Sequence, residues 1–88
     1  DRAEHARQTL ENIKGILEGA GTSFDNVIKR TVIVANAKVH EKMRAVIESY
    51  FTSPVASTTL QGGLMRDDML LEVEVVAVVP DWEPDKGR

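Results

Sequence analysis

The stretch Met69–Val79, which reads MLLEVEVVAVV, is the most strongly patterned part of this 88-residue chain. Successive side chains of a β-strand point to opposite faces of a sheet, so alternate residues form two sets. One set is wholly apolar and suits a face packed against helices: Met69, Leu71, Val73, Val75, Ala77 and Val79. The other set is half apolar and half acidic: Leu70, Glu72, Glu74, Val76 and Val78. The pattern predicts a strand whose second face is covered by another copy of the chain or by a further segment.

The rest of the chain predicts two helices and two more strands. Apolar residues recur at steps of three and four across Ala3–Ala20, which is typical of an amphipathic helix, and Gly21 suits its C-terminal end. A second stripe of this kind spans Lys38–Phe51. Strands are predicted at Val27–Val34, which is rich in β-branched residues, and at Ser57–Gln61. The order α-β-α-β-β indicates an α+β fold with both helices on one face of the sheet.

Composition narrows the classes of function. With 42% hydrophobic and 28% charged residues, the chain suits one small domain, residues 1–80, followed by a polar tail, residues 81–88. The absence of cysteine excludes disulfides, zinc–thiolate sites and a thiolate nucleophile. A net charge of -3 disfavours nucleic acid as a partner. No apolar run approaches the ~20 residues of a membrane span, and no secretion signal is recognisable, so we expect a cytoplasmic protein without a membrane partner.

Charged residues near the predicted strands offer candidate chemistry. Glu72 and Glu74 share one strand face, and such a pair can supply a general base. The alternative is a pair of surface carboxylates that neighbouring arginines neutralise. The cations within or beside the predicted elements are Arg30, Arg44 and Arg66. Each can clamp a substrate carboxylate, be solvated, or form an ion pair with one of the two glutamates.

The histidines and glycines indicate no cofactor site. His5 and His40 have no second ligand at metal-binding spacing, so we expect no metal. The pair Gly62-Gly63 is isolated and suits a turn or bulge better than a phosphate-binding loop. We therefore expect no cofactor.

Several segments together resemble one known family. They are QTLENIKGIL at 8–17, Gly21, DNVIK at 25–29, TVIV at 31–34, Tyr50-Phe51 and LEVEVVA at 71–77. This pattern is similar to the Rid family, also called the YjgF or reactive intermediate deaminase family. The resemblance implies a chorismate-mutase-like fold in which three subunits close their sheets into a barrel with ligand clefts between subunits. Members of the family hydrolyse reactive 2-imino or enamino acids to keto acids and ammonia, using an arginine for the carboxylate and water activated near a glutamate.

The resemblance also implies roles for single residues. Glu72 matches the glutamate that positions water, and Thr59 matches a position that lines the cleft. Ser57 stands where the family carries its carboxylate-binding arginine. Arg44 matches a second-helix position near the cleft and becomes the candidate replacement cation. Met65-Arg66 replaces a Leu-Pro pair of the family.

Two functions stay open on this evidence. The first is a deaminase-like hydrolase that acts on a small imine, enamine or related carbonyl metabolite in an intersubunit cleft. The second is a non-catalytic member that binds a small metabolite or scaffolds a homotrimer. Since serine lacks the paired charged hydrogen bonds of arginine, we expect negligible deamination of simple 2-imino acids, and we expect Ser57→Arg to raise it. Ribonuclease activity, ascribed to some relatives, is disfavoured by the net charge.

The chain begins at Asp1, where the first helix starts, whereas the family places a β-hairpin before that helix. Without the hairpin, one sheet edge keeps unpaired backbone groups. We therefore expect the native protein to contain a preceding hairpin, which proteolytic processing cuts from this chain or which a companion N-terminal peptide carries; the alternative is that the sequence is a fragment.

Overall fold

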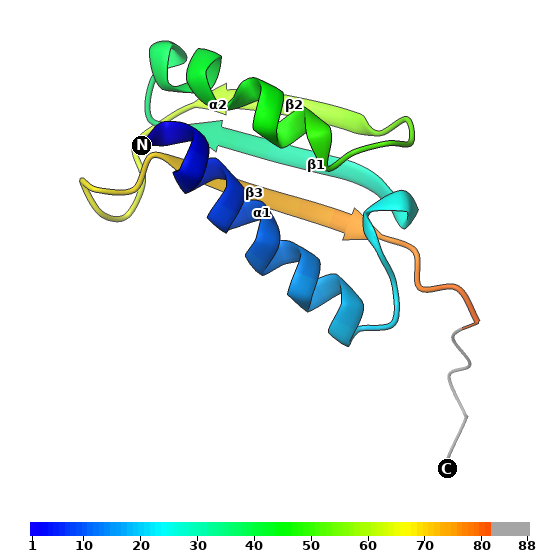
Figure 1. The fold of residues 1–88 in the computed structure, drawn as a ribbon. Helices are drawn as coiled ribbons and strands as arrows, with labels where there is room; N and C mark the ends of the chain where they lie inside the picture. Colours follow the sequence, from blue (N-terminus) through cyan, green and yellow to red (C-terminus); the bar gives the residue numbers. More distant parts are fainter. Residues whose placement is uncertain (82–88) are drawn as a thin grey trace.

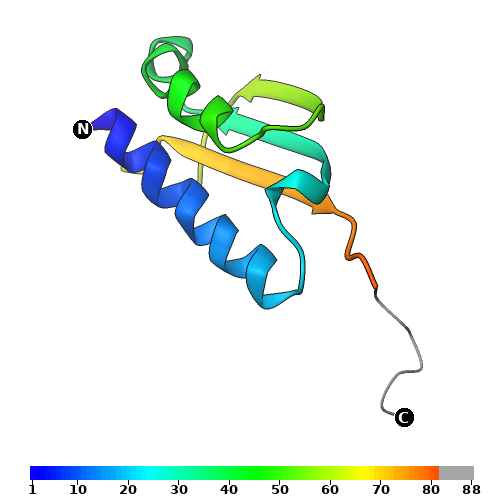
Figure 2. The same ribbon diagram turned by 45° about the vertical axis from the view of Figure 1, so that its right-hand side comes forward.

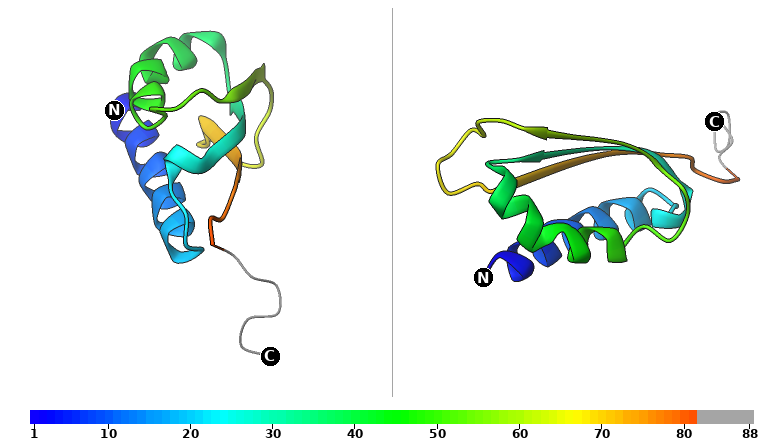
Figure 3. Two further views of the ribbon diagram at one scale, coloured as in Figure 1. Left: turned by 90° about the vertical axis from the view of Figure 1, so that its right-hand side faces the viewer. Right: turned by 90° about the horizontal axis from the view of Figure 1, so that it is seen from above.

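A computed structural model describes residues 1–81 of the chain. The helices are α1 (Arg2–Gly19), the short 3-10 helix η1 (Phe24–Asn26) and α2 (Ala37–Ser49). The strands are β1 (Val27–Val34), β2 (Ala56–Gln61) and β3 (Leu71–Ala77) (Figure 1). Seen from above, both long helices lie on the same side of the sheet (Figure 3). The predicted α+β arrangement is confirmed; of the predicted polar tail, all but Asp81 lies outside the described residues.

Signals in the sequence set both ends of α1. The Asp1 carboxylate accepts a hydrogen bond from the Glu4 N–H at 3.1 Å, which caps the N-terminus. Gly21 follows the helix with a φ of 86°, a left-handed conformation that a residue with a Cβ adopts only with strain. The Thr22 N–H then donates to the Leu17 carbonyl at 2.9 Å. Figure 2 shows that the segment after α1 reverses direction through η1 before β1 begins.

The sheet has the strand order β2-β1-β3. β1 pairs in parallel with β2 and antiparallel with β3, so α2 lies in the crossover between the two parallel strands. In this register Arg30 lies opposite Ser57 on one side and opposite Val75 on the other. Val32 lies opposite Thr59 in the same way. The register therefore decides which polar side chains of β2 meet the buried face of β1.

The core fills the space between the helices and the sheet. Its most deeply buried large side chains are Leu10, Val32, Val39, Met43 and Ile47. Phe24 of η1 adds an aromatic cluster, with ring centroids 5.4 Å from Tyr50 and 5.1 Å from Phe51. The Tyr50 hydroxyl donates to a Glu11 carboxylate oxygen at 2.6 Å and so joins the end of α2 to α1. The hydrogen bond to this carboxylate raises the pKa of Tyr50 above its ordinary value.

The face of the sheet that neither helix covers, here called the open face, has apolar side chains that are exposed in the single chain, as the strand pattern predicts for Val76 and Val78 without a covering partner. They are 48% and 51% exposed, and Leu60 of β2 adds a third at 50%. Val78 lies just beyond β3, which ends at Ala77. The prediction for Leu70 is wrong, because this residue is partly buried and packs against the core. β3 begins only at Leu71, so Leu70 belongs to the preceding loop and does not follow the strand alternation.

Candidate functional site

The candidate residues predicted from the sequence lie on two different faces of the sheet. The face that α2 covers includes Ser57 and Thr59, since Thr59 lies beside the buried Val32. Glu72 pairs with Ile33, the next residue along β1, and is exposed on the opposite face. Within one chain the structure therefore does not bring Glu72 together with the other candidates.

A cavity of about 290 Å³ lies between α2 and the sheet, and we call it the α2 cavity. Thr59 and Arg44, which the resemblance placed near a ligand cleft, both line it. Its other lining residues are Arg30, Val32, His40, Ile47 and Glu48. With two arginines and one glutamate, the lining carries a formal charge of +1 when the histidine is neutral. Such a surface attracts a small anion.

Arg30 is the buried cation of this cavity, with an exposed fraction of 9%. Its Nε donates to the Ser57 hydroxyl at 2.8 Å, and its Nη2 forms an ion pair with Glu48. The guanidinium also lies over the ring of Phe51, 4.5 Å from the centroid. Nη1 is buried and has no hydrogen-bond partner among residues 1–81. The side chain is thus held by three neighbours and keeps one nitrogen without a partner.

The partner of Arg30 corrects a sequence-based expectation. An ion pair with Glu72 or Glu74 was one alternative, but both glutamates lie on the open face, whereas Arg30 lies on the helix-covered face. The carboxylate comes instead from Glu48 of α2. Sequence spacing gave no sign of Glu48 because the contact joins different elements. The strand alternation did contain a signal for Arg30, which shares its face with the buried Val32.

The other two arginines have different surroundings. Arg44 is exposed on α2 and forms no ion pair with a carboxylate of residues 1–81. Arg66 pairs with Asp68 at 2.9 Å, not with the glutamates of β3. This contact lowers the pKa of the Asp68 carboxyl and raises the pKa of the Arg66 guanidinium. Arg44 therefore remains a candidate for binding a carboxylate in the α2 cavity. Arg66 does not line that cavity, and its charge is already paired.

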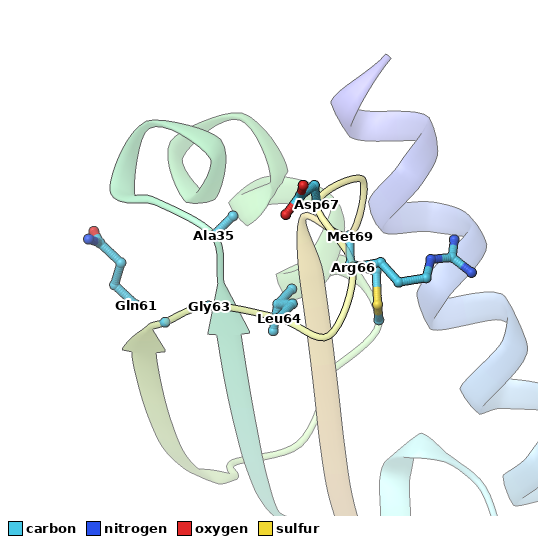
Figure 4. A pocket seen from close by; sticks show the side chains of 8 residues that line it. Ala35, Gln61, Gly63, Leu64, Arg66, Asp67 and Met69 are labelled. Atoms are coloured by element: carbon cyan, nitrogen blue, oxygen red, sulfur yellow. The ribbon is translucent and has the colours of Figure 1, made fainter.

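A second cavity, of about 360 Å³, lies at the end of the sheet where the segment between β2 and β3 turns (Figure 4). Gln61, Gly63 and Leu64 line it together with Arg66. In Figure 4 the Arg66 side chain points away from Gln61 and Gly63. Because that arginine is already paired with an exposed aspartate, we place the candidate site in the α2 cavity.

Metal binding finds no support within residues 1–81, where no three histidine, cysteine or acidic side chains come together as a ligand set. His40 lines the α2 cavity, whereas His5 lies on α1. In the same part of the chain, neither helix has the length and apolar character needed to cross a bilayer.

Known proteins are similar to this chain in sequence and in fold. Residues 1–79 match the family model described as endoribonuclease L-PSP. The chain is 40% identical over 78 residues to a RutC family protein of Pyrococcus horikoshii, covering 88% of this chain and 62% of that protein. It is 32% identical over 82 residues to the 2-iminobutanoate/2-iminopropanoate deaminase of Escherichia coli K12, covering 89% and 64%. The crystal structure of the E. coli YjgF gene product superimposes with a TM-score of 0.80 at 32% identity, covering 89% and 65%.

The chain therefore belongs to this family, the Rid (YjgF/RutC) family, and its fold is the chorismate-mutase-like fold that the resemblance implied. It spans less than two thirds of the length of these curated relatives.

Proposed function

We propose that the α2 cavity is the substrate site of a Rid-type imine deaminase. The observation that carries the proposal is the cavity itself, which gathers Thr59, Arg44 and the buried Arg30 from three different elements. Two relatives support the reaction class: the E. coli protein named above and a human protein, 34% identical over 77 residues, both carry the name 2-iminobutanoate/2-iminopropanoate deaminase.

The proposed substrate is a small 2-imino acid or a related enamine. Its carboxylate suits the cationic lining of the cavity. In the reaction, water adds to the imine carbon and forms a C–O bond, and the C–N bond then breaks. One imino acid and one water give one 2-keto acid and one ammonia, so no external oxidant or cofactor takes part.

Glu72 is the proposed group that orients the attacking water. It lies on the open face of the sheet, whereas the α2 cavity lies on the other face. The two meet only if Glu72 of one subunit adjoins the cavity of another, so the proposal includes an intersubunit cleft in a homotrimer. The exposed Val76, Val78 and Leu60 offer apolar surface for that contact.

One observation favours a second candidate, a non-catalytic member that binds a small metabolite or scaffolds a trimer. Ser57 replaces the arginine expected from the family resemblance, and its hydroxyl already accepts the hydrogen bond from Arg30. The expectation of negligible deamination, however, depended on a site without a cation at this position. The guanidinium of Arg30 removes that premise, so we now expect measurable turnover of 2-imino acids.

Turnover of 2-iminobutanoate, generated in the assay and followed as ammonia release, tests the proposal in the full-length protein. Glu72→Gln keeps the shape of the side chain but removes the carboxylate, and kcat should fall by at least about a hundredfold. Glu74→Gln removes a carboxylate from the same strand face two residues away, and its loss should be much smaller. Equal effects of the two substitutions, or no turnover by the wild type, would contradict the proposed reaction.

A further inference from the structure

We propose that Arg30 binds the substrate carboxylate and that it replaces, from the neighbouring strand, the arginine expected at Ser57. The inference rests on the proposed function, since it concerns the ligand of the same cavity. It differs from the resemblance, which pointed to Arg44 on α2 as the replacement cation.

The cross-strand register explains how the replacement works. Arg30 of β1 and Ser57 of β2 are direct partners in the parallel pair, so their side chains leave the sheet side by side on one face. The Arg30 side chain reaches across to β2, where its Nε lies 2.8 Å from the Ser57 hydroxyl oxygen. A guanidinium therefore stands beside position 57 although the residue at position 57 is a serine.

Three contacts fix the orientation of this guanidinium. Ser57 accepts from Nε, Glu48 pairs with Nη2, and the Phe51 ring lies against its face. An arginine held in this way loses little freedom when it binds an anion, because its side chain is already ordered. Ser57 is then a positioning residue and not a substitute for a cation.

The missing hydrogen-bond partner of Arg30 Nη1 points to a ligand. Buried N–H groups in folded proteins almost always have an acceptor, and Nη1 has none among residues 1–81. Arg30 also lines the α2 cavity, whose polar lining admits a small molecule. A carboxylate in that cavity supplies the missing acceptor and adds a counter-charge to a guanidinium that one half-exposed glutamate neutralises only in part.

This assignment reverses the expectation for Ser57→Arg. A second guanidinium directly opposite Arg30 places two like charges on one cross-strand pair, which is unfavourable. The substitution also removes the hydroxyl that orients the Arg30 Nε, so the guanidinium loses its position and carboxylate binding should weaken. The double variant Arg30→Ser, Ser57→Arg has a single guanidinium, now on the neighbouring strand. It should bind the carboxylate with an affinity closer to that of the wild type.

Binding of 2-oxobutanoate, the keto acid that would form from 2-iminobutanoate, tests the assignment by calorimetry on the full-length protein. Its uncharged amide, 2-oxobutanamide, serves as the probe without a carboxylate. Arg30→Gln should raise the Kd of 2-oxobutanoate roughly tenfold to a hundredfold and leave the Kd of the amide within about twofold. Arg44→Gln should have a smaller effect, and Arg7→Gln, on the exposed surface of α1, should have none.

Three results would overturn the inference: no saturable binding of 2-oxobutanoate, an unchanged Kd in Arg30→Gln, or a larger effect of Arg44→Gln. If Arg30→Gln does not fold, the guanidinium NMR signals of the wild type decide instead. The signals of the Arg30 guanidinium should shift to a plateau as 2-oxobutanoate is added, and should not shift with the amide. If 2-oxobutanoate binds saturably but the Arg30 signals do not shift, the inference is overturned.

Failure of the proposed function is distinguishable from failure of this inference. If 2-oxobutanoate binds in an Arg30-dependent manner but imino acids are not hydrolysed, the deaminase proposal fails and the assignment of Arg30 stands. If wild type and Arg30→Gln hydrolyse 2-iminobutanoate equally well, the assignment fails and the deaminase proposal stands.

Discussion

Arg30 of β1 and Glu48 of α2, which are 18 residues apart in the sequence, form an ion pair between a buried guanidinium and a half-exposed carboxylate. The pair joins the helix to the sheet at the wall of the α2 cavity. A buried charge without its counter-ion is costly, so this contact stabilises both the fold and the position of the guanidinium.

Glu48→Ala should lower the free energy of unfolding by about 1–2 kcal/mol, because it leaves Arg30 buried without its carboxylate. The estimate is below the range for fully buried pairs because half of the Glu48 side chain is exposed to solvent. Urea denaturation measures the change. Glu41→Ala, an exposed glutamate on the same helix, is the matched control and should change stability by less than about 0.5 kcal/mol. An equal loss in both variants would show that the ion pair contributes nothing specific.

Met43→Ala should lower the free energy of unfolding by about 2–5 kcal/mol, since the Met43 side chain is fully buried beneath α2. The loss combines the transfer of apolar atoms to water with the cavity that remains. Met65→Ala removes the same side chain from a position that is 93% exposed and should have little effect. Thermal unfolding of the two variants provides the comparison, and similar melting temperatures would place Met43 outside the core.

Val76→Asp should dissociate the proposed trimer, because it puts a charge among the exposed apolar residues of the open face. Sedimentation at micromolar concentration should give a mass near three subunits for the wild type and a lower mass for the variant. Ile16→Asp, on α1 at 71% exposure, should leave the wild-type mass unchanged. A stable wild-type monomer would rule out the interface on the open face.

The phenol of Tyr50 should ionise above its ordinary pKa of 10.0, because its hydrogen bond to the Glu11 carboxylate favours the protonated form. The chain has one tyrosine, so the ultraviolet absorbance of tyrosinate reports this group alone. A pKa that is higher in the folded state gives stability that is complete below the unfolded pKa of about 10 and is lost as pH rises through the folded pKa. Glu11→Gln should lower the titration midpoint toward 10, and Glu18→Gln on the same helix should not. A midpoint at or below 10 in the wild type would contradict the hydrogen bond.

Much of the fold was predictable because it depends on short-range spacing. Three sequence signals each specify the structure of their own segment alone. They are the steps of three and four in the first helix, the β-branched run at Val27–Val34 and the glycine after α1. The alternation in Met69–Val79 also separated the buried Leu71 and the partly buried Val73, Val75 and Ala77 from the exposed Val76 and Val78. The family resemblance added Thr59 and Arg44, which the structure places on one cavity.

The local sequence pattern therefore predicted where the helices and strands lie and, on the last strand, the two sets of residues, since helical and strand periods are properties of the local backbone. It did not determine the register between neighbouring strands, that is, which residues of one strand lie beside which residues of the next. Strand pairing joins segments that are distant in the chain. The tertiary structure alone decided that Arg30 meets Ser57 and Glu48, and that Glu72 lies on the opposite face. A change of one residue in that register would turn Ser57 to the other face of the sheet and separate it from Arg30.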